Sequence, residues 1–226
     1  MSVAMLKSDQ EIQKDVLREL DWDPQVDPVE VGVQVEDGIV TLTGTISTYA
    51  KKLAAKRAAH RVAGVLDVVN NLIVEIAEPH KRNDQEIAKA VRHALEWDVM
   101  VPDTHIHSTV SNGRVMLEGH VDNWADRMAA ECAVERLAGV RSVDNQLQVE
   151  PKIRVEAKAI RDAIKGALER QTRRETDRIS ITVRDGLVTL TGTVRSWAEK
   201  NAAHNAAACT PGVQRIDDRL EIDAHS

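Results

Sequence analysis

The chain repeats one eight-residue phrase three times. The phrase reads DGIVTLTG at residues 37–44, NGRVMLEG at 112–119 and DGLVTLTG at 185–192. Its glycines Gly38, Gly113 and Gly186 are separated by 75 and then 73 residues, and the same offsets align apolar, aromatic and glycine positions on both sides. Helical solenoids repeat at roughly 20–50 residues, so this longer period indicates a small domain. The sequence predicts three tandem copies, at residues 1–77, 78–151 and 152–226.

Each phrase forms the turn and the second strand of a predicted β-hairpin. Asp-Gly and Asn-Gly between alternating strands favour a two-residue type I′ turn, because both of its central residues need positive φ. Apolar residues alternate with polar ones on both sides of the turn. In copy one they are Val31, Val33, Val35, Val40 and Leu42. This register leaves one apolar face that ends at Gly44, where the missing side chain lets a helix or loop approach closely.

Helices flank each predicted hairpin. The first helix of copy one carries Ile12, Val16 and Leu20 at helical spacing. A second helix begins after an N-cap residue, which is Thr48 in copy one. A third strand follows, through Val68, Leu72 and Val74 in copy one. The order α-β-β-α-β predicts an α+β fold in which two helices cover one face of a three-stranded sheet.

This pattern resembles the BON domain, a module of OsmY-type and nodulation-related bacterial proteins. The resemblance rests on the hairpin phrase, the aromatic residue that opens the second helix, the Gly-Val pair at its end and the closing strand. That strand reads VVNNL at 68–72, VDNQL at 143–147 and IDDRL at 216–220. The resemblance covers essentially the whole chain. It implies attachment to a phospholipid surface or an envelope protein, links to osmotic stress, potassium binding in some cytoplasmic relatives, and no catalytic residues.

Composition and charge exclude several classes of protein. The net charge of −6 gives no basic footprint, so we expect no nucleic-acid partner. Cys132 and Cys209 lie at non-equivalent positions and do not form a disulfide framework. The first residues contain no apolar stretch typical of a signal peptide. No segment approaches the ~18 apolar residues of a membrane span. These features predict a cytoplasmic protein.

Enzyme motifs are missing from the sequence. It contains no phosphate-binding glycine loop, nucleophile elbow or His-Glu zinc helix. The positions that all three copies share are apolar residues, glycines and helix caps, which are structural. We therefore expect a non-enzymatic protein without a cofactor.

Two features suit attachment to a surface. The second helix of copy one carries five cations and no acid, as an anionic phospholipid surface requires, although a charged helix face is usually only solvated. The cations are Lys51, Lys52, Lys56, Arg57 and Arg61. An aromatic residue opens the second helix of every copy, at Tyr49, Trp124 and Trp197. These rings either pack within or between domains, which we favour, or enter a membrane interface.

A histidine cluster is peculiar to copy two. The hairpin register pairs His105 with His120 and His107 with Glu118 on the polar face. Cross-strand partners have Cβ atoms about 4.5–5.5 Å apart, and imidazoles so placed can share a zinc or nickel ion. A solvated polar face is the alternative that we favour.

Together these features predict a protein that binds a phospholipid surface or a protein partner, in osmotic or envelope stress. The alternative is a small-cation or metal-binding sensor. The oligomeric state is left open.

Overall fold

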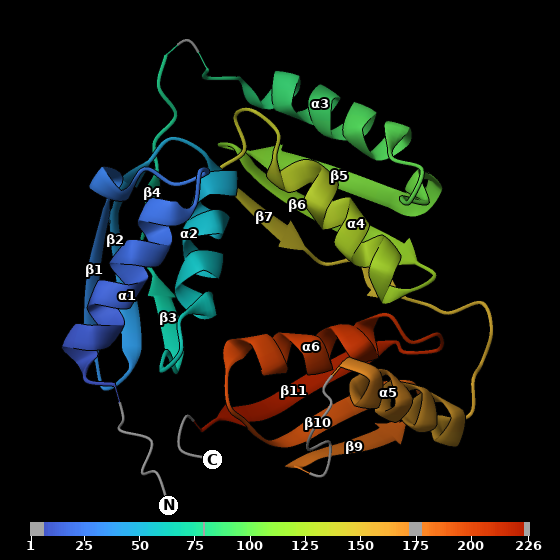
Figure 1. Cartoon of the computed structure of the whole chain (residues 1–226). Coiled ribbons are helices and arrows are strands. Elements are labelled where there is room, and N and C mark those ends of the chain that lie inside the picture. Colours follow the sequence, from blue (N-terminus) through green and yellow to red (C-terminus); the bar gives the residue numbers. More distant parts are fainter. Residues whose placement is uncertain (1–6, 79, 172–177, 224–226) are drawn as a thin grey trace, which may run out of the picture. The chain divides into compact units, whose positions relative to one another are not determined.

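The computed structural model describes residues 7–78, 80–171 and 178–223, so the outer ends of predicted copies one and three lie outside it. The elements follow the predicted order (Figure 1). Copy one contains α1 (Asp9–Trp22), η1 (Pro28–Glu30), β1 (Val31–Glu36), β2 (Ile39–Ile46), α2 (Tyr49–Arg61), β3 (Asp67–Asn70) and β4 (Ile73–Val74). Copy two contains α3 (Asp84–Trp97), η2 (Asp103–His105), β5 (Ile106–Ser111), β6 (Arg114–Val121), α4 (Trp124–Glu135), β7 (Ser142–Asn145) and β8 (Gln148–Val149). Copy three contains α5 (Ala157–Gln171), β9 (Ile179–Arg184), β10 (Leu187–Val194), α6 (Trp197–Ala208) and β11 (Arg215–Ile222). The α+β fold is confirmed.

Each copy builds one sheet around its hairpin. The strand orders are β1-β2-β3, β5-β6-β7 and β11-β10-β9. The hairpins are antiparallel, and in copies one and two the third strand runs parallel to the middle strand. A parallel neighbour needs a crossover connection, and the second helix supplies it. The middle strand is therefore the central strand, and the first strand of the hairpin lies at the edge of the sheet.

The third strand differs from the prediction in copies one and two. The sequence predicts one continuous strand, but β3 and β4 are separate in copy one, and both pair with β2. Asn70 lies at the break: its side chain accepts a hydrogen bond from the backbone N–H of Leu72 at 3.2 Å and donates one to the carbonyl of Lys52 in α2 at 3.0 Å. Asn145 repeats both bonds in copy two. The closing motif thus ties the third strand to the second helix.

The hairpin turns have the predicted conformation. Their first residues have φ of 49° at Asp37, 52° at Asn112 and 46° at Asp185, and the glycines that follow have φ of 75° to 76°. Positive φ at both central residues is the property of a type I′ turn. The register follows from the turn, so that Val33 faces Leu42 across the hairpin of copy one.

The apolar face of each sheet is buried beneath both helices of its copy (Figure 1). Leu42, Leu117 and Leu190, at equivalent positions in the three middle strands, are 0% exposed. The second helix of copy one packs through alanines, including Ala54 and Ala58, which are at most 2% exposed. Small residues on this helix face let it lie close to the sheet, so branched aliphatic residues of the strands fill the core.

Candidate functional site

The five cations of α2 do not form one free surface. The ammonium group of Lys52 donates a hydrogen bond of 2.6 Å to the carbonyl of Leu72, where the third strand breaks. The guanidinium of Arg61 binds Glu19 of α1 at 2.6 Å and Asp23 at 2.9 Å. These two predicted contact residues therefore hold α2 against the rest of copy one.

The ion pairs of Arg61 also shift the pKa values of Arg61 and Asp23. The hydrogen bond to Glu19 raises the pKa of the Arg61 guanidinium above its usual value. Burial alone would raise the pKa of the Asp23 carboxyl, but hydrogen bonds from Arg61 and from the backbone N–H of Gln25 outweigh burial and lower it. The Arg61 side chain is half exposed, so each pair contributes no more than about 1 kcal/mol to folding.

Three cations of α2 remain available to a partner. Lys56 and Arg57 are exposed and Lys51 is half-buried, and within the described ranges none of the three side chains forms a hydrogen bond or ion pair. The cationic surface is thus smaller than the sequence indicates, and it is centred on the outer face of α2.

The aromatic residues occupy the first position of each second helix, as the sequence predicts. Tyr49, Trp124 and Trp197 are all half-buried. A cation one turn later lies over two of the rings: the Arg127 guanidinium is 4.8 Å from the Trp124 centroid, and the Lys200 ammonium is 5.3 Å from that of Trp197. Such cation–π contacts fix the ring against its own helix, as expected of a packed side chain. Entry of these rings into a membrane interface stays a prediction.

The histidine cluster is partly assembled. The rings of His105 and His120 stack with centroids 4.5 Å apart and planes at 19°. His107 faces Glu118 across the hairpin, as predicted. Within the part of the chain that the structure describes, no group of three or more His, Cys, Asp or Glu side chains is arranged to hold a metal ion. The geometry therefore offers one imidazole pair, and a four-ligand site stays a prediction.

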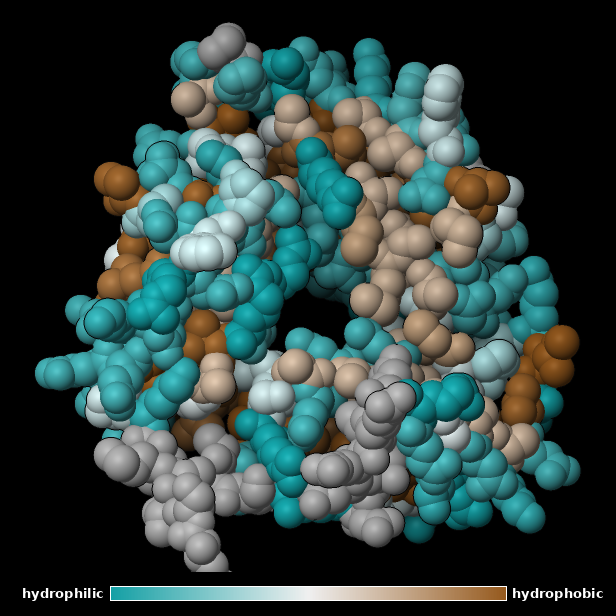
Figure 2. Space-filling view, viewed as in Figure 1, coloured by the Kyte–Doolittle hydropathy of each residue, from teal (hydrophilic) through white to brown (hydrophobic). Residues whose placement is uncertain are grey.

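An exposed apolar segment at the end of α3 is not among the sites that the sequence predicts. Trp97 is 85% exposed, Val99 96% and Met100 60%, and we call these three residues the Trp97 loop. The helix ends here because Asp98 takes an extended conformation, and its carboxylate accepts a hydrogen bond from the N–H of Met100 at 2.9 Å. Val101 then returns to the core. Figure 2 shows hydrophobic atoms protruding at this end of α3.

A signal for this segment exists in the sequence. Trp22 lies 75 residues before Trp97, also ends the first helix of its copy and is 79% exposed. The buried stripe of α3 runs through Ile87, Val91 and Leu95, and Trp97 lies off that stripe. A contiguous group of exposed apolar side chains, rather than a single one, indicates an interaction surface. Val99 and Met100 extend this exposed apolar surface in copy two, whereas copy one has Pro24 and Gln25 at the same positions.

Comparisons with known proteins agree with the repeat. The model of the BON domain family matches residues 8–76, 83–151 and 156–224. The chain is 29% identical over 123 residues to the osmotically-inducible protein Y of Escherichia coli K12, covering 53% of this chain and 61% of that protein. It is 27% identical over 140 residues to the outer membrane lipoprotein DolP of Haemophilus influenzae, covering 59% and 72% of the two chains.

Two further findings bear on these comparisons. A solved structure of CdsD, a structural protein of the type III secretion system of Chlamydia trachomatis, aligns over 93% of this chain and 91% of its own. The TM-score is 0.26 and the sequence identity is 14%. No helix in the described ranges is both long and apolar enough to cross a membrane.

Proposed function

The chain belongs to the BON domain family, and on this premise we propose that it is a non-enzymatic protein that attaches to the surface of a phospholipid bilayer. Its relatives include a protein named for osmotic induction and one named as an outer membrane lipoprotein. These names support a role in osmotic or envelope stress. The cytoplasmic location expected from the sequence stays a prediction, because the name of one relative describes an outer membrane lipoprotein.

The observation that carries this proposal is the exposure of the Trp97 loop. Burying an apolar side chain of this size completely contributes about 1.5–3 kcal/mol, so partial burial of three contributes several kcal/mol. Tryptophan suits the headgroup region of a bilayer because its ring is apolar and its N–H can remain hydrated. The loop therefore has the chemistry of a shallow interfacial anchor.

Charge near the loop decides which bilayer it binds. Glu96 is paired with Arg92 at 2.8 Å, and Asp98 places one carboxylate within the segment itself. A single charge next to an anionic bilayer changes the binding free energy by about 1 kcal/mol, less than the apolar contribution. We therefore expect the Trp97 loop to bind neutral phosphatidylcholine and to depend little on salt.

Replacing the Trp97 loop with serines (Trp97→Ser, Val99→Ser and Met100→Ser together) is expected to weaken binding to phosphatidylcholine vesicles at least tenfold, because the apolar contact is lost. Co-sedimentation with the vesicles measures the effect. The matched control replaces three exposed apolar residues elsewhere, Val29, Ile73 and Ile153, which are 93%, 65% and 75% exposed. This control should bind like the wild type.

Other results of these experiments would assign binding to a different surface or a different partner. If the control and the Trp97 loop variant pellet equally with wild type, the loop is not the contact. If wild type pellets only with phosphatidylglycerol, and changing Lys51, Lys56 and Arg57 to glutamate abolishes this, the basic surface of α2 is the contact. If wild type pellets with neither lipid, the partner is a protein.

The stacked imidazole pair favours a metal-binding sensor as a second candidate function. A rotation of the His105 and His120 rings would direct one nitrogen of each at a shared ion, which zinc and nickel accept. At a metal concentration about tenfold above its Kd, the ion should stabilise copy two by roughly 1 kcal/mol and raise its Tm by a few degrees. His105→Gln should abolish this shift in a thermal melt, while His93→Gln on α3 should retain it. Equal shifts in both variants would contradict the pair as the site.

A further inference from the structure

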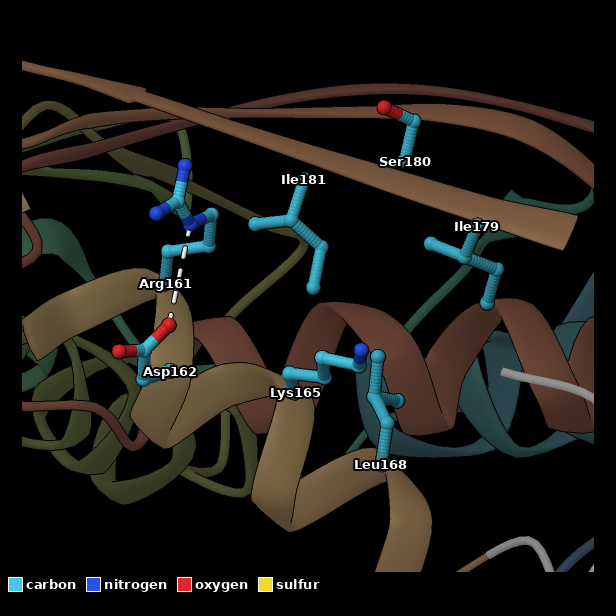
Figure 3. Close-up of a pocket in the computed structure, with 7 residues that line it drawn as sticks. All are labelled: Arg161, Asp162, Lys165, Leu168, Ile179, Ser180 and Ile181. Atoms are coloured by element: carbon cyan, nitrogen blue, oxygen red, sulfur yellow. Dashed lines mark ion pairs between the residues drawn. The ribbon is translucent and has the colours of Figure 1, made fainter. Parts of the chain in front are cut away.

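Copy three contains a groove of about 410 Å³ between α5 and the edge strand β9 (Figure 3). Its floor is apolar and consists of Leu168, Ile179 and Ile181. Figure 3 shows the two isoleucines directed from the strand towards the helix. The side chains of Arg161 and Lys165 rise from α5 at its rim. Asp162 also lines the rim, so the groove combines an apolar floor with a wall of two cations and one acid.

The strand that borders the groove has an unpaired backbone edge. Among the strands that the structure describes, β9 pairs only with β10, in the sheet order β11-β10-β9. Hydrogen-bonded and non-hydrogen-bonded residue pairs alternate along an antiparallel ladder. Arg184 and Leu187 flank the two-residue turn as a hydrogen-bonded pair. Three positions further along, Ile181 and Leu190 therefore form a non-hydrogen-bonded pair. The N–H and C=O groups of Ile181 thus point away from β10. Such an edge can accept a further strand.

Copy one shows the same backbone groups already engaged. Val33 corresponds to Ile181, and its carbonyl accepts a hydrogen bond of 2.7 Å from the side chain of Gln13 in α1. Gln13 corresponds to Arg161, which makes no such bond and instead lies 3.8 Å from Asp162. Val33 is buried at 7% exposure, whereas Ile181 is half-buried. The helix therefore closes the edge in copy one and leaves it open in copy three.

Charge determines what this groove accepts. Arg161 has only a long contact with the neighbouring Asp162, and Lys165 is exposed without a side-chain partner in the described ranges. The wall is therefore net positive and attracts carboxylates. Pairing of β9 with the β9 strand of a second copy would bring the same cations of both chains together, and like charges would oppose it.

We propose that the groove between α5 and β9 binds an extended acidic segment of a partner protein as an added strand. Main-chain hydrogen bonds to the Ile181 edge supply affinity, and alternate side chains of the added strand face the helix. Apolar side chains meet the floor, and carboxylates meet Lys165 and Arg161. The site is separate from the Trp97 loop, so the proposal does not depend on membrane attachment.

The proposal is tested by measuring the binding of labelled octapeptides to the full chain by fluorescence anisotropy. The probe TVTVTETE should bind at least tenfold more tightly than TVTVTKTK, because only the first is acidic. Changing Arg161 and Lys165 together to glutamate should reverse this preference. N-methylation of alternate peptide amides should weaken binding at least tenfold, because it removes the main-chain donors. Equal binding of the acidic, basic and methylated peptides would overturn the proposal.

Two proline variants, one in copy three and one in copy one, test how much the strand edge contributes to peptide binding. Ile181→Pro removes an outward N–H and keeps the ladder to β10, so it should abolish binding of TVTVTETE. Val33→Pro makes the equivalent change in copy one and should leave binding intact. If circular dichroism shows that Ile181→Pro unfolds copy three, the methylated peptide decides the question. A dimer of the wild-type chain that Ile181→Pro dissolves would assign the groove to a second copy and overturn the proposal.

Discussion

Replacing Gly119 with alanine is expected to destabilise copy two by more than about 3 kcal/mol. Gly119 has φ of 122°, a conformation in which residues with a side chain are strained by about 1–3 kcal/mol. A Cβ atom here would also overlap the backbone carbonyl oxygen of His105. That carbonyl belongs to the segment entering the edge strand, where Ile106 faces Gly119. The clash can be relieved only by separating the two strands.

Hydrogen exchange of copy two amides, together with thermal melting, measures this effect. The control is Gly166→Ala in α5, where the new Cβ would meet only the Arg170 side chain at 3.4 Å. Alanine in a helix interior is favoured over glycine, so the control should gain up to about 1 kcal/mol. A Tm for Gly119→Ala within a few degrees of wild type would show that the strands can separate without cost.

The hairpins illustrate what the sequence could predict. Asp-Gly and Asn-Gly turns determine positive φ, and this determines the register, so that Val31 faces Gly44 as expected. The terminal glycine is predicted to admit a helix or loop. The group that approaches Gly44 is the carbonyl of Glu30, the last residue of η1. The approaching segment is local in sequence, because η1 directly precedes the edge strand that pairs with Gly44.

Long-range polar contacts could not be read from local patterns. Lys52 and Arg61 have the sequence signature of surface cations on a polar helix face. In the structure they bind the Leu72 carbonyl, 20 residues away, and the Asp23 carboxylate, 38 residues away. Periodicity shows which face of a helix is solvated, but it contains no information on the groups that a neighbouring element brings to that face. The break in the third strand escaped prediction for the same reason.

The four tryptophans show how position decides the role of one residue type. Trp124 begins a helix, where it is half-buried with Arg127 over its ring. Trp97 ends a helix, away from its buried stripe, and is 85% exposed. Repetition identified Trp124 because all three copies have an aromatic residue there. Trp97 has a counterpart only in copy one, so a search for positions shared by all three copies misses it.

Removing the carboxylate of Asp84 is expected to destabilise copy two by about 2 kcal/mol. Its two oxygens accept hydrogen bonds from the backbone N–H groups of Asn112 at 2.8 Å and Gly113 at 2.9 Å. Hydrogen bonds to a charged group contribute about 1.5–3 kcal/mol, and a negative charge in the first turn of α3 also interacts favourably with the helix dipole. Asp84→Ala loses both contributions, and Asp84→Asn should retain part of the first.

In copy three the missing carboxylate can be introduced instead of removed. Asp9 holds the turn of copy one in the same way as Asp84, but the aligned residue of copy three is Ala157. The turn there has the same conformation, with φ of 46° at Asp185 and 75° at Gly186. Ala157→Asp should therefore stabilise copy three by about 1 kcal/mol, less than the loss at Asp84 because ordering the new side chain costs entropy. Hydrogen exchange of the Gly186 amide should slow in this variant. Faster exchange would mean that the first turn of α5 cannot reach the hairpin of its own copy.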